Sequence, residues 1–204
     1  MSILLLITAA LLGLLAFFEP CTIATHTLFA VRTHNAARLQ RGLALAQLIA
    51  SRTLLLSWIF GAAAVVGLDA VSAKSAVLML GTIGLVYLVS RRVYLPVPHL
   101  EFFRLLPRHD AWSQGLKLGL TLPACTLPLV LIVSLLSALT RQPAIAVLAA
   151  MLFALMFTVP TLWGVIYGLG TKARAFLAQT AALSPYLTTL LLWGAAFTIW
   201  QMGV

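Results

Sequence analysis

The stretch Phe18-Glu19-Pro20-Cys21-Thr22 lies inside the first long apolar segment of the chain and decides how that segment can fold. It places a carboxylate, a helix-breaking proline and a thiol side by side where a membrane-spanning helix would be uniformly apolar. A second stretch, Leu122-Pro123-Ala124-Cys125-Thr126-Leu127-Pro128, repeats the arrangement about half a chain later. The protein has two cysteines, one in each stretch, so the two stretches are expected to form halves of one site.

The composition around these stretches is that of an integral membrane protein. Of the 204 residues, 62% are hydrophobic and 8% are charged, against about 25% charged residues in a soluble domain. A helical span needs about 20 apolar residues, so the chain has room for about six spans and for no sizeable soluble domain. The net charge of +9 does not indicate nucleic-acid binding, because the basic residues lie in short connectors between apolar segments.

These apolar segments predict one all-α membrane domain over residues 1–204, with six transmembrane helices. No Lys or Arg precedes the first segment, so we interpret it as a retained span and not as a signal peptide. Prolines inside the first and fourth segments predict that both of these helices are broken. The expected spans cover about residues 3–31, 42–66, 75–90, 112–139, 144–169 and 185–202.

The basic residues are distributed unevenly between the two sides of these spans. Ten of them lie in or beside the connectors one–two, three–four and five–six, and two lie on the opposite side. The positive-inside rule places the ten in the cytoplasm, so both termini are expected in the periplasm of a bacterial inner membrane. The ten are Arg32, Arg38, Arg41, Arg91, Arg92, Arg104, Arg108, Lys117, Lys172 and Arg174, and the two are Lys74 and Arg141.

Spans one and four therefore run in opposite directions, and each begins a group of three spans. This arrangement predicts two inverted three-helix repeats, at about residues 1–95 and 108–204, with helices one and four broken at their Pro-Cys motifs. In inverted repeats of this kind the interrupted helices meet near the membrane midplane and form the functional site.

Cys21 and Cys125 are the residues expected to carry chemistry, as a reversible redox pair. Proline opens the helix beside each of them, at Pro20, Pro123 and Pro128. Free amide groups at the N-terminus of a half-helix favour a thiolate, which is the reactive form of cysteine. The alternative is that each cysteine packs as a small apolar side chain.

Two ionisable residues inside spans are candidate supporting groups. Glu19 is expected to handle the protons that accompany thiol–disulfide exchange, or to form a structural ion pair with Arg52. Arg52 lies about ten residues into the second span, which corresponds to a depth of about 15 Å and places it near the midplane. A guanidinium there would also stabilise a thiolate at Cys21.

Three further polar residues follow the cysteines closely. His26 is a proton relay, a metal ligand or a hydrogen-bonded histidine near the cytoplasmic end of its helix. Thr22 and Thr126, each directly after a cysteine, are expected to satisfy backbone groups that the prolines free. The two cysteines fit no zinc-binding pattern, so no metal site is expected.

The paired Pro-Cys segments in spans one and four of a six-span, inverted-repeat protein resemble CcdA and the membrane domain of DsbD. The resemblance covers the whole chain in topology and two short motifs in sequence. The family's first motif usually reads Pro-Cys-x-x-Pro. Pro20 and Cys21 match it, and Ala24 stands at the place of the second proline.

In the second motif, the family usually has proline directly before the cysteine. Here Ala124 takes that place, Pro123 lies one residue earlier, and Pro128 matches the downstream proline. The two alanine positions leave open a different partner, or a relative without redox activity.

The resemblance implies a transmembrane thiol–disulfide oxidoreductase without metal or organic cofactor. It would carry reducing equivalents from cytoplasmic thioredoxin to periplasmic thioredoxin-like proteins, including those of cytochrome c maturation, through a reversible Cys21–Cys125 disulfide. Two other functions remain open. One is a small-substrate or soft-metal-ion transporter that uses the same midplane site, with Glu19 and His26 beside the cysteines. The other is a structural membrane subunit.

Overall fold

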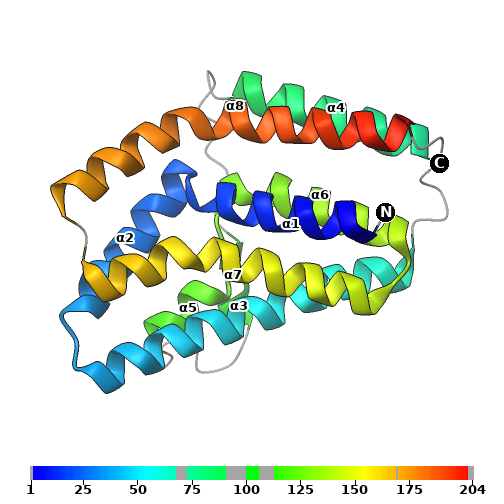
Figure 1. The fold of residues 1–204 in the computed structure, drawn as a ribbon. Coiled ribbons are helices and arrows are strands. Elements are labelled where there is room, and N and C mark those ends of the chain that lie inside the picture. Colours follow the sequence, from blue (N-terminus) through cyan, green and yellow to red (C-terminus); the bar gives the residue numbers. More distant parts are fainter. Residues whose placement is uncertain (1, 68–72, 91–99, 106–112, 169, 202–204) are drawn as a thin grey trace.

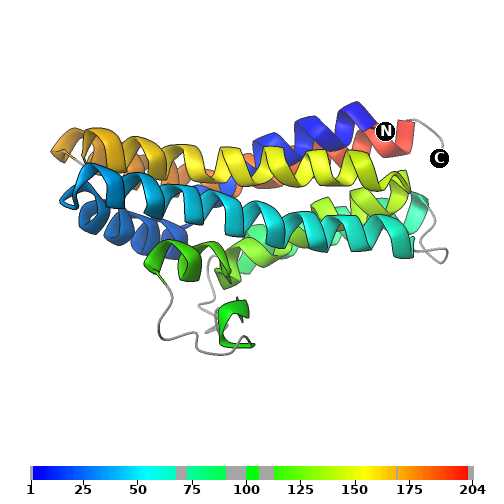
Figure 2. The ribbon, with the colours of Figure 1, turned by 90° about the horizontal axis from the view of Figure 1, so that it is seen from below.

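The computed structural model describes residues 2–67, 73–90, 100–105, 113–168 and 170–201. The described chain forms one elongated bundle in which most helices run along a common direction (Figure 1). The beginning of the first helix and the end of the last helix lie at the same end of the bundle (Figures 1 and 2). The helices are α1 (Ser2–Phe17), α2 (Pro20–His34), α3 (Arg38–Val66), α4 (Ala73–Ser90), α5 (Gln114–Gly119), α6 (Leu127–Thr140), α7 (Pro143–Tyr167) and α8 (Thr171–Gln201).

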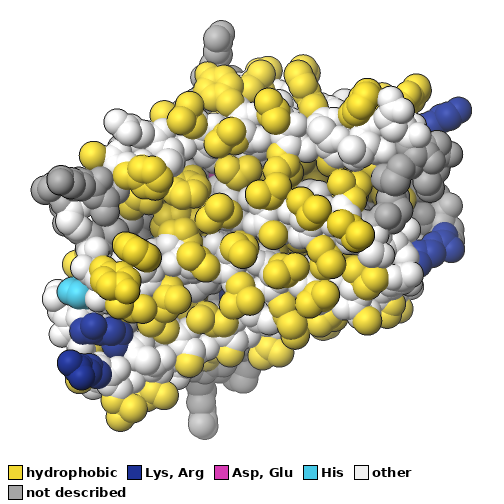
Figure 3. All heavy atoms as spheres, viewed as in Figure 1, with side chains coloured by type: hydrophobic (Ala, Val, Ile, Leu, Met, Phe, Trp, Pro, Cys, Tyr) yellow, Lys and Arg dark blue, Asp and Glu magenta, His cyan; other side chains and the backbone are white. Residues whose placement is uncertain are grey.

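Several of these helices have the length and composition of membrane spans. Three qualify individually, namely α3, α7 and the Ala175–Gln201 part of α8, and α1 with α2 makes a fourth if the bent pair is one span. Apolar side chains cover the middle of the face in Figure 3, and basic side chains gather at its two ends. The chain therefore has the architecture of a helical membrane protein, as the composition predicted. The number of six spans stays a prediction.

Prolines and glycines set the ends of several helices. Pro20 and Pro143 begin α2 and α7, where a fixed φ angle and a missing N–H are compatible with the first turn. Helices α3 and α7 each end at a glycine with positive φ, Gly67 at 48° and Gly168 at 79°. Glycine adopts this conformation without steric cost, so it stops both helices cleanly.

The core forms where the two halves of the chain pack on each other. Helices α1 and α3 both lie along α7, and α4 lies along α8. Gly13 permits the close approach of α1 to α7, because a Cβ atom there would lie 2.5 Å from the carbonyl oxygen of Phe153. Small residues at such crossings are typical of helix packing in membranes. The rings of Phe60, Phe153 and Phe157 are fully buried beside this crossing.

Two regions differ from the sequence-based expectation. The residues 171–184, predicted to be a connector, form the first half of α8, which continues through Pro185. The reason is local, since this stretch is rich in alanine, the strongest helix former.

The expected polar connector before span four also contributes structure. Strand β1 (Leu100–Glu101) and the 3-10 helix η1 (Phe102–Leu105) stand out from one side of the bundle (Figure 2).

Candidate functional site

The first broken helix is a sharp bend. Helix α1 ends at Phe17 and α2 begins at Pro20, with the two axes 73° apart. The backbone stays hydrogen-bonded on both sides of the bend. Before it, the N–H of Phe18 donates to the carbonyl of Leu15, and after it, the N–H of Ile23 donates to the carbonyl of Glu19. Proline at the first position of α2 cannot extend α1, which explains why the bend falls here.

The second broken helix is unwound over several residues. Between α5 and α6 the chain forms strand β2 (Thr121–Leu122) and the 3-10 turn η3 (Ala124–Thr126). Strand β2 pairs antiparallel with β1 of the connector, with Leu100 opposite Leu122 and Glu101 opposite Thr121. The hydroxyl of Thr126 donates to the carbonyl of Pro123 at 2.8 Å, which is the backbone role predicted for it.

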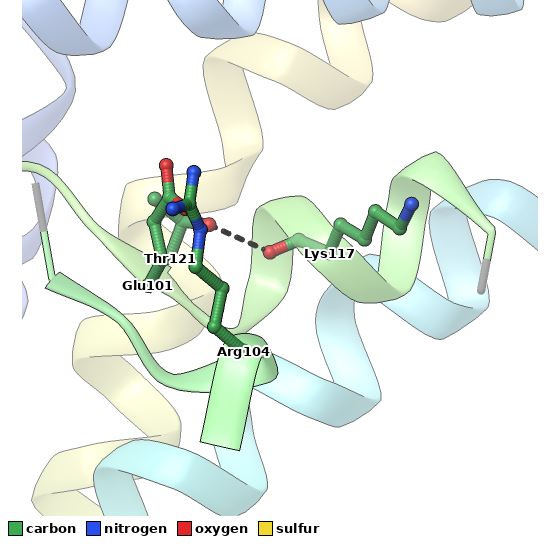
Figure 4. A network of polar contacts seen from close by, with 4 residues as sticks. All are labelled: Glu101, Arg104, Lys117 and Thr121. Carbon is green, nitrogen blue, oxygen red and sulfur yellow. Dashed lines mark hydrogen bonds and ion pairs between the residues drawn. The ribbon is translucent and has the colours of Figure 1, made fainter. Parts of the chain in front are cut away.

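Polar contacts lie within the connector that supplies β1 and within the chain just before the second break (Figure 4). Arg104 forms an ion pair with Glu101, and Thr121 donates a hydrogen bond to the carbonyl of Lys117 at 2.8 Å. The N–H of Phe102 also reaches the carbonyl of Leu120 at 3.1 Å. Backbone groups freed by unwinding are thus paired with the connector, as a membrane environment requires.

The two breaks meet at the cysteines. Cys21 and Cys125 are joined by a disulfide, with their Cα atoms 6.9 Å apart. Both are partly buried. The predicted pairing of the two cysteines is therefore present, and their redox activity stays a prediction. The hydroxyl of Thr22 lies 3.8 Å from the sulfur of Cys125, a contact that the sequence did not predict.

Glu19 is buried on the α8 side of the first break. Its side chain is 5% exposed, and Ser184 of α8 donates a hydrogen bond to its Oε1 at 3.3 Å. The sequence suggested an ion pair between Glu19 and Arg52. The hydrogen bonds of Arg52 go to α2, α5 and α7 instead, because α3 packs on those helices while Glu19 faces α8.

Arg52 is fully buried among neutral partners. Its Nη2 lies 3.1 Å from Nε2 of His26 and donates to the carbonyl of Leu118 at 3.2 Å. Its Nη1 donates to the hydroxyl of Thr158 at 3.4 Å, and the guanidinium carbon lies 4.2 Å above the centre of the Phe157 ring. Arg52 therefore links α3 to both broken helices and to α7.

The contacts of His26 determine which of its nitrogens carries hydrogen. A guanidinium has no acceptor, so Nε2 must accept the hydrogen bond from Arg52. The hydrogen of a neutral imidazole is then on Nδ1, which donates to the hydroxyl of Thr161 at 2.6 Å. The ring also stacks on Phe157, with centroids 5.3 Å apart. Of the interpretations open from the sequence, the structure agrees with a hydrogen-bonded histidine.

Sequence reasoning missed Thr158, Thr161 and Phe157 as members of this cluster. A signal was available, because Thr158 and Thr161 are polar residues three positions apart in an apolar span and so share one helix face.

Among the residues that the structure describes, no group of three or more His, Cys, Asp or Glu side chains is placed to hold a metal ion.

No known protein-family model, curated protein or solved structure matches this chain.

Proposed function

We propose that the protein is a transmembrane thiol–disulfide oxidoreductase that carries reducing equivalents through the Cys21–Cys125 disulfide. The observation that supports this most directly is the disulfide itself. It joins the two cysteines of the protein, 104 residues apart, at the breaks of two interrupted helices. Both cysteines are only partly buried, which suits a bond that exchanges with the thiols of a partner protein.

The proposal includes six spans arranged as two inverted repeats, at about residues 1–95 and 108–204. Reciprocal packing supports it. The first broken helix, α1 with α2, packs on α7, and the second, α5 with α6, packs on α3. Helices α3 and α7 pack on each other, as do α4 and α8. Exchanging the two halves leaves this set of contacts unchanged, as an inverted repeat requires.

Glycine positions support the same relation. Gly13 of α1 lies against the backbone of Phe153 in α7, and Gly119 of α5 lies against the backbone of Leu48 in α3. Leu48 and Phe153 are separated in sequence by close to the 104 residues that separate the cysteines. Each half therefore places a glycine of its broken helix against an equivalent residue of the other half.

The reaction cycle has two exchanges. A cytoplasmic thioredoxin, as a dithiol, reduces the Cys21–Cys125 disulfide through a mixed disulfide and leaves oxidised. The reduced pair then becomes accessible from the periplasm and reduces a thioredoxin-like protein by the same chemistry, when one half rocks against the other. The excess of basic residues in alternate connectors supports an inner-membrane location with both termini periplasmic.

Supporting roles follow from the surroundings of the disulfide. Pro20, Pro123 and Pro128 keep the helices broken beside the sulfurs. Glu19, buried beside the bend, exchanges the protons that accompany reduction and oxidation. Arg52 connects the two broken helices and thereby holds the site together.

Thiol trapping in cells tests this function. Free thiols are alkylated in intact membranes, with and without a functional cytoplasmic thioredoxin system, and Cys21→Ser and Cys125→Ser serve as mobility standards. We expect the disulfide to accumulate when the cytoplasmic reductant is removed and to disappear when it is restored. If no disulfide forms in either condition, or if serine at both positions leaves reduction of periplasmic thiol proteins unchanged, the proposal is wrong.

A further inference from the structure

The two sulfurs of the disulfide have different surroundings, because the hydroxyl of Thr22 contacts the sulfur of Cys125. We propose that Thr22 selects which sulfur a thiol partner attacks. Attack falls on Sγ of Cys21, and Sγ of Cys125 leaves as the thiolate that the Thr22 hydroxyl stabilises. This inference rests on the proposed function and assigns the order of bond exchange within it.

The direction of the Thr22 hydrogen bond follows from chemistry. Thr22 is fully buried, and its Oγ1 lies 3.8 Å from Sγ of Cys125. A disulfide sulfur carries no hydrogen, so the hydroxyl must be the donor. A thiolate is a stronger acceptor than a disulfide sulfur, so this contact strengthens as negative charge develops on Cys125.

Within the part of the second half that the structure describes, the residue equivalent to Thr22 does not donate to Cys21. Thr126 holds the matching position after Cys125, yet its hydroxyl donates to the carbonyl of Pro123 at 2.8 Å. Cys21 lies in the first turn of α2, and Cys125 lies in turn η3 directly before α6, so the dipole of the following helix favours a thiolate at either position. The Thr22 hydroxyl is therefore the contact that distinguishes the two sulfurs.

The exchange then proceeds in balanced steps. A partner thiolate forms a bond to Sγ of Cys21, the Cys21–Cys125 bond breaks, and its electron pair goes to Sγ of Cys125. The second thiol of the partner, after loss of its proton, attacks the partner sulfur of the mixed disulfide and expels the Cys21 thiolate. The partner leaves with a disulfide, and the two protons lost by its thiols balance those gained by the two cysteines.

Glutathione is a suitable probe for the first step, because a monothiol leaves its adduct on the attacked cysteine. Purified full-length protein with the disulfide intact is placed in lipid nanodiscs, exposed briefly to reduced glutathione, quenched with acid and mapped by mass spectrometry. We expect wild-type adducts at Cys21 to exceed those at Cys125 by about tenfold, the typical effect of one hydrogen bond to a charged group. In Thr22→Val the ratio should fall to near one, and Thr22→Ser should restore it.

Thr126→Val is the matched control, because it removes the hydroxyl that directly follows the other cysteine and that bonds the carbonyl of Pro123 instead of a sulfur. It should keep the preference for Cys21. Equal adducts at both cysteines in the wild type would overturn the proposal, and so would a Thr22→Val protein that keeps the wild-type ratio. If Thr22→Val does not fold, Thr22→Ser is the variant that tests the proposal. Serine retains the hydroxyl donor, so equal adducts at the two cysteines in Thr22→Ser would contradict the proposal.

This experiment separates the inference from the function on which it rests. The ratio of adducts is a property of the purified protein and does not depend on which partner it has in cells. A preference for Cys21 together with unchanged periplasmic reduction in the double serine variant would contradict the proposed function alone.

Discussion

The two broken helices have similar sequences and different structures. At Cys21 the chain bends sharply, by 73°, between two regular helices. At Cys125 it unwinds into strand β2 and turn η3 and receives strand β1 from the connector. The comparison shows that a Pro-Cys motif sets where a membrane helix breaks, while the number of prolines and the available neighbours set how it breaks.

Proline spacing accounts for most of this difference. The first break has one proline, Pro20, which begins the new helix at its first position. The second has Pro123 and Pro128, five positions apart, so hydrogen bonds are lost over more than one turn. A longer unwound stretch frees more backbone groups, and these need partners inside a membrane. Strand β1 and the Thr126 hydroxyl provide them.

Arg52 gives the largest expected effect, because it joins the two breaks. It bonds His26 of α2 after the first break and the carbonyl of Leu118 in α5 before the second. Arg52→Ala removes these contacts and leaves a cavity beside Phe157, so we expect a loss of about 3 kcal/mol in the free energy of unfolding. The measurement is reversible unfolding of the purified protein in detergent.

Arg38→Ala is the control for this substitution. Arg38 lies on the same helix and is exposed, so its removal should change stability by less than about 0.5 kcal/mol. Equal stability of the two variants would show that the two broken helices are held together without Arg52.

The close crossings of the broken helices give the next largest effect. In Gly13→Ala the new Cβ meets backbone atoms of Phe153, with the carbonyl oxygen at 2.5 Å and Cα at 2.8 Å, and neither can move without shifting α7. In Gly119→Ala it meets the Ser51 hydroxyl, which can rotate, and the carbonyl oxygen of Leu48 at 2.9 Å. We expect Gly13→Ala to cost about 2 kcal/mol in unfolding free energy and Gly119→Ala to cost less.

Gly81→Ala is the control, since nothing lies within 4 Å of a Cβ atom at that position of α4. It should stabilise the protein by up to about 1 kcal/mol through helix propensity alone. A larger loss for Gly119→Ala than for Gly13→Ala would reverse the comparison and identify the Gly119 position as the more tightly packed of the two.

The sequence predicted the parts of this molecule that depend on composition and on proline. Hydropathy located the apolar helices, and the prolines located both breaks, while the equivalent positions of Cys21 and Cys125 in the two halves suggested that they pair. It could not predict the partners of Arg52, because they come from three other helices that the sequence does not place relative to one another. Strand β1 was also missed, since two residues are too short to show an alternating pattern.

The ion pair at the second break gives the smallest expected effect and tests what holds the connector in place. Arg104 is 69% exposed and Glu101 is 28% exposed, so water weakens their attraction. We expect Arg104→Ala to lower the free energy of unfolding by less than about 0.5 kcal/mol, with a double-mutant cycle through Glu101→Gln giving a coupling of similar size. The β1–β2 pairing should then persist, because its backbone hydrogen bonds and the packing of Phe102 on the core do not depend on the ion pair. A coupling well above 1 kcal/mol would mean that the ion pair, and not backbone pairing alone, stabilises the connector beside the second break.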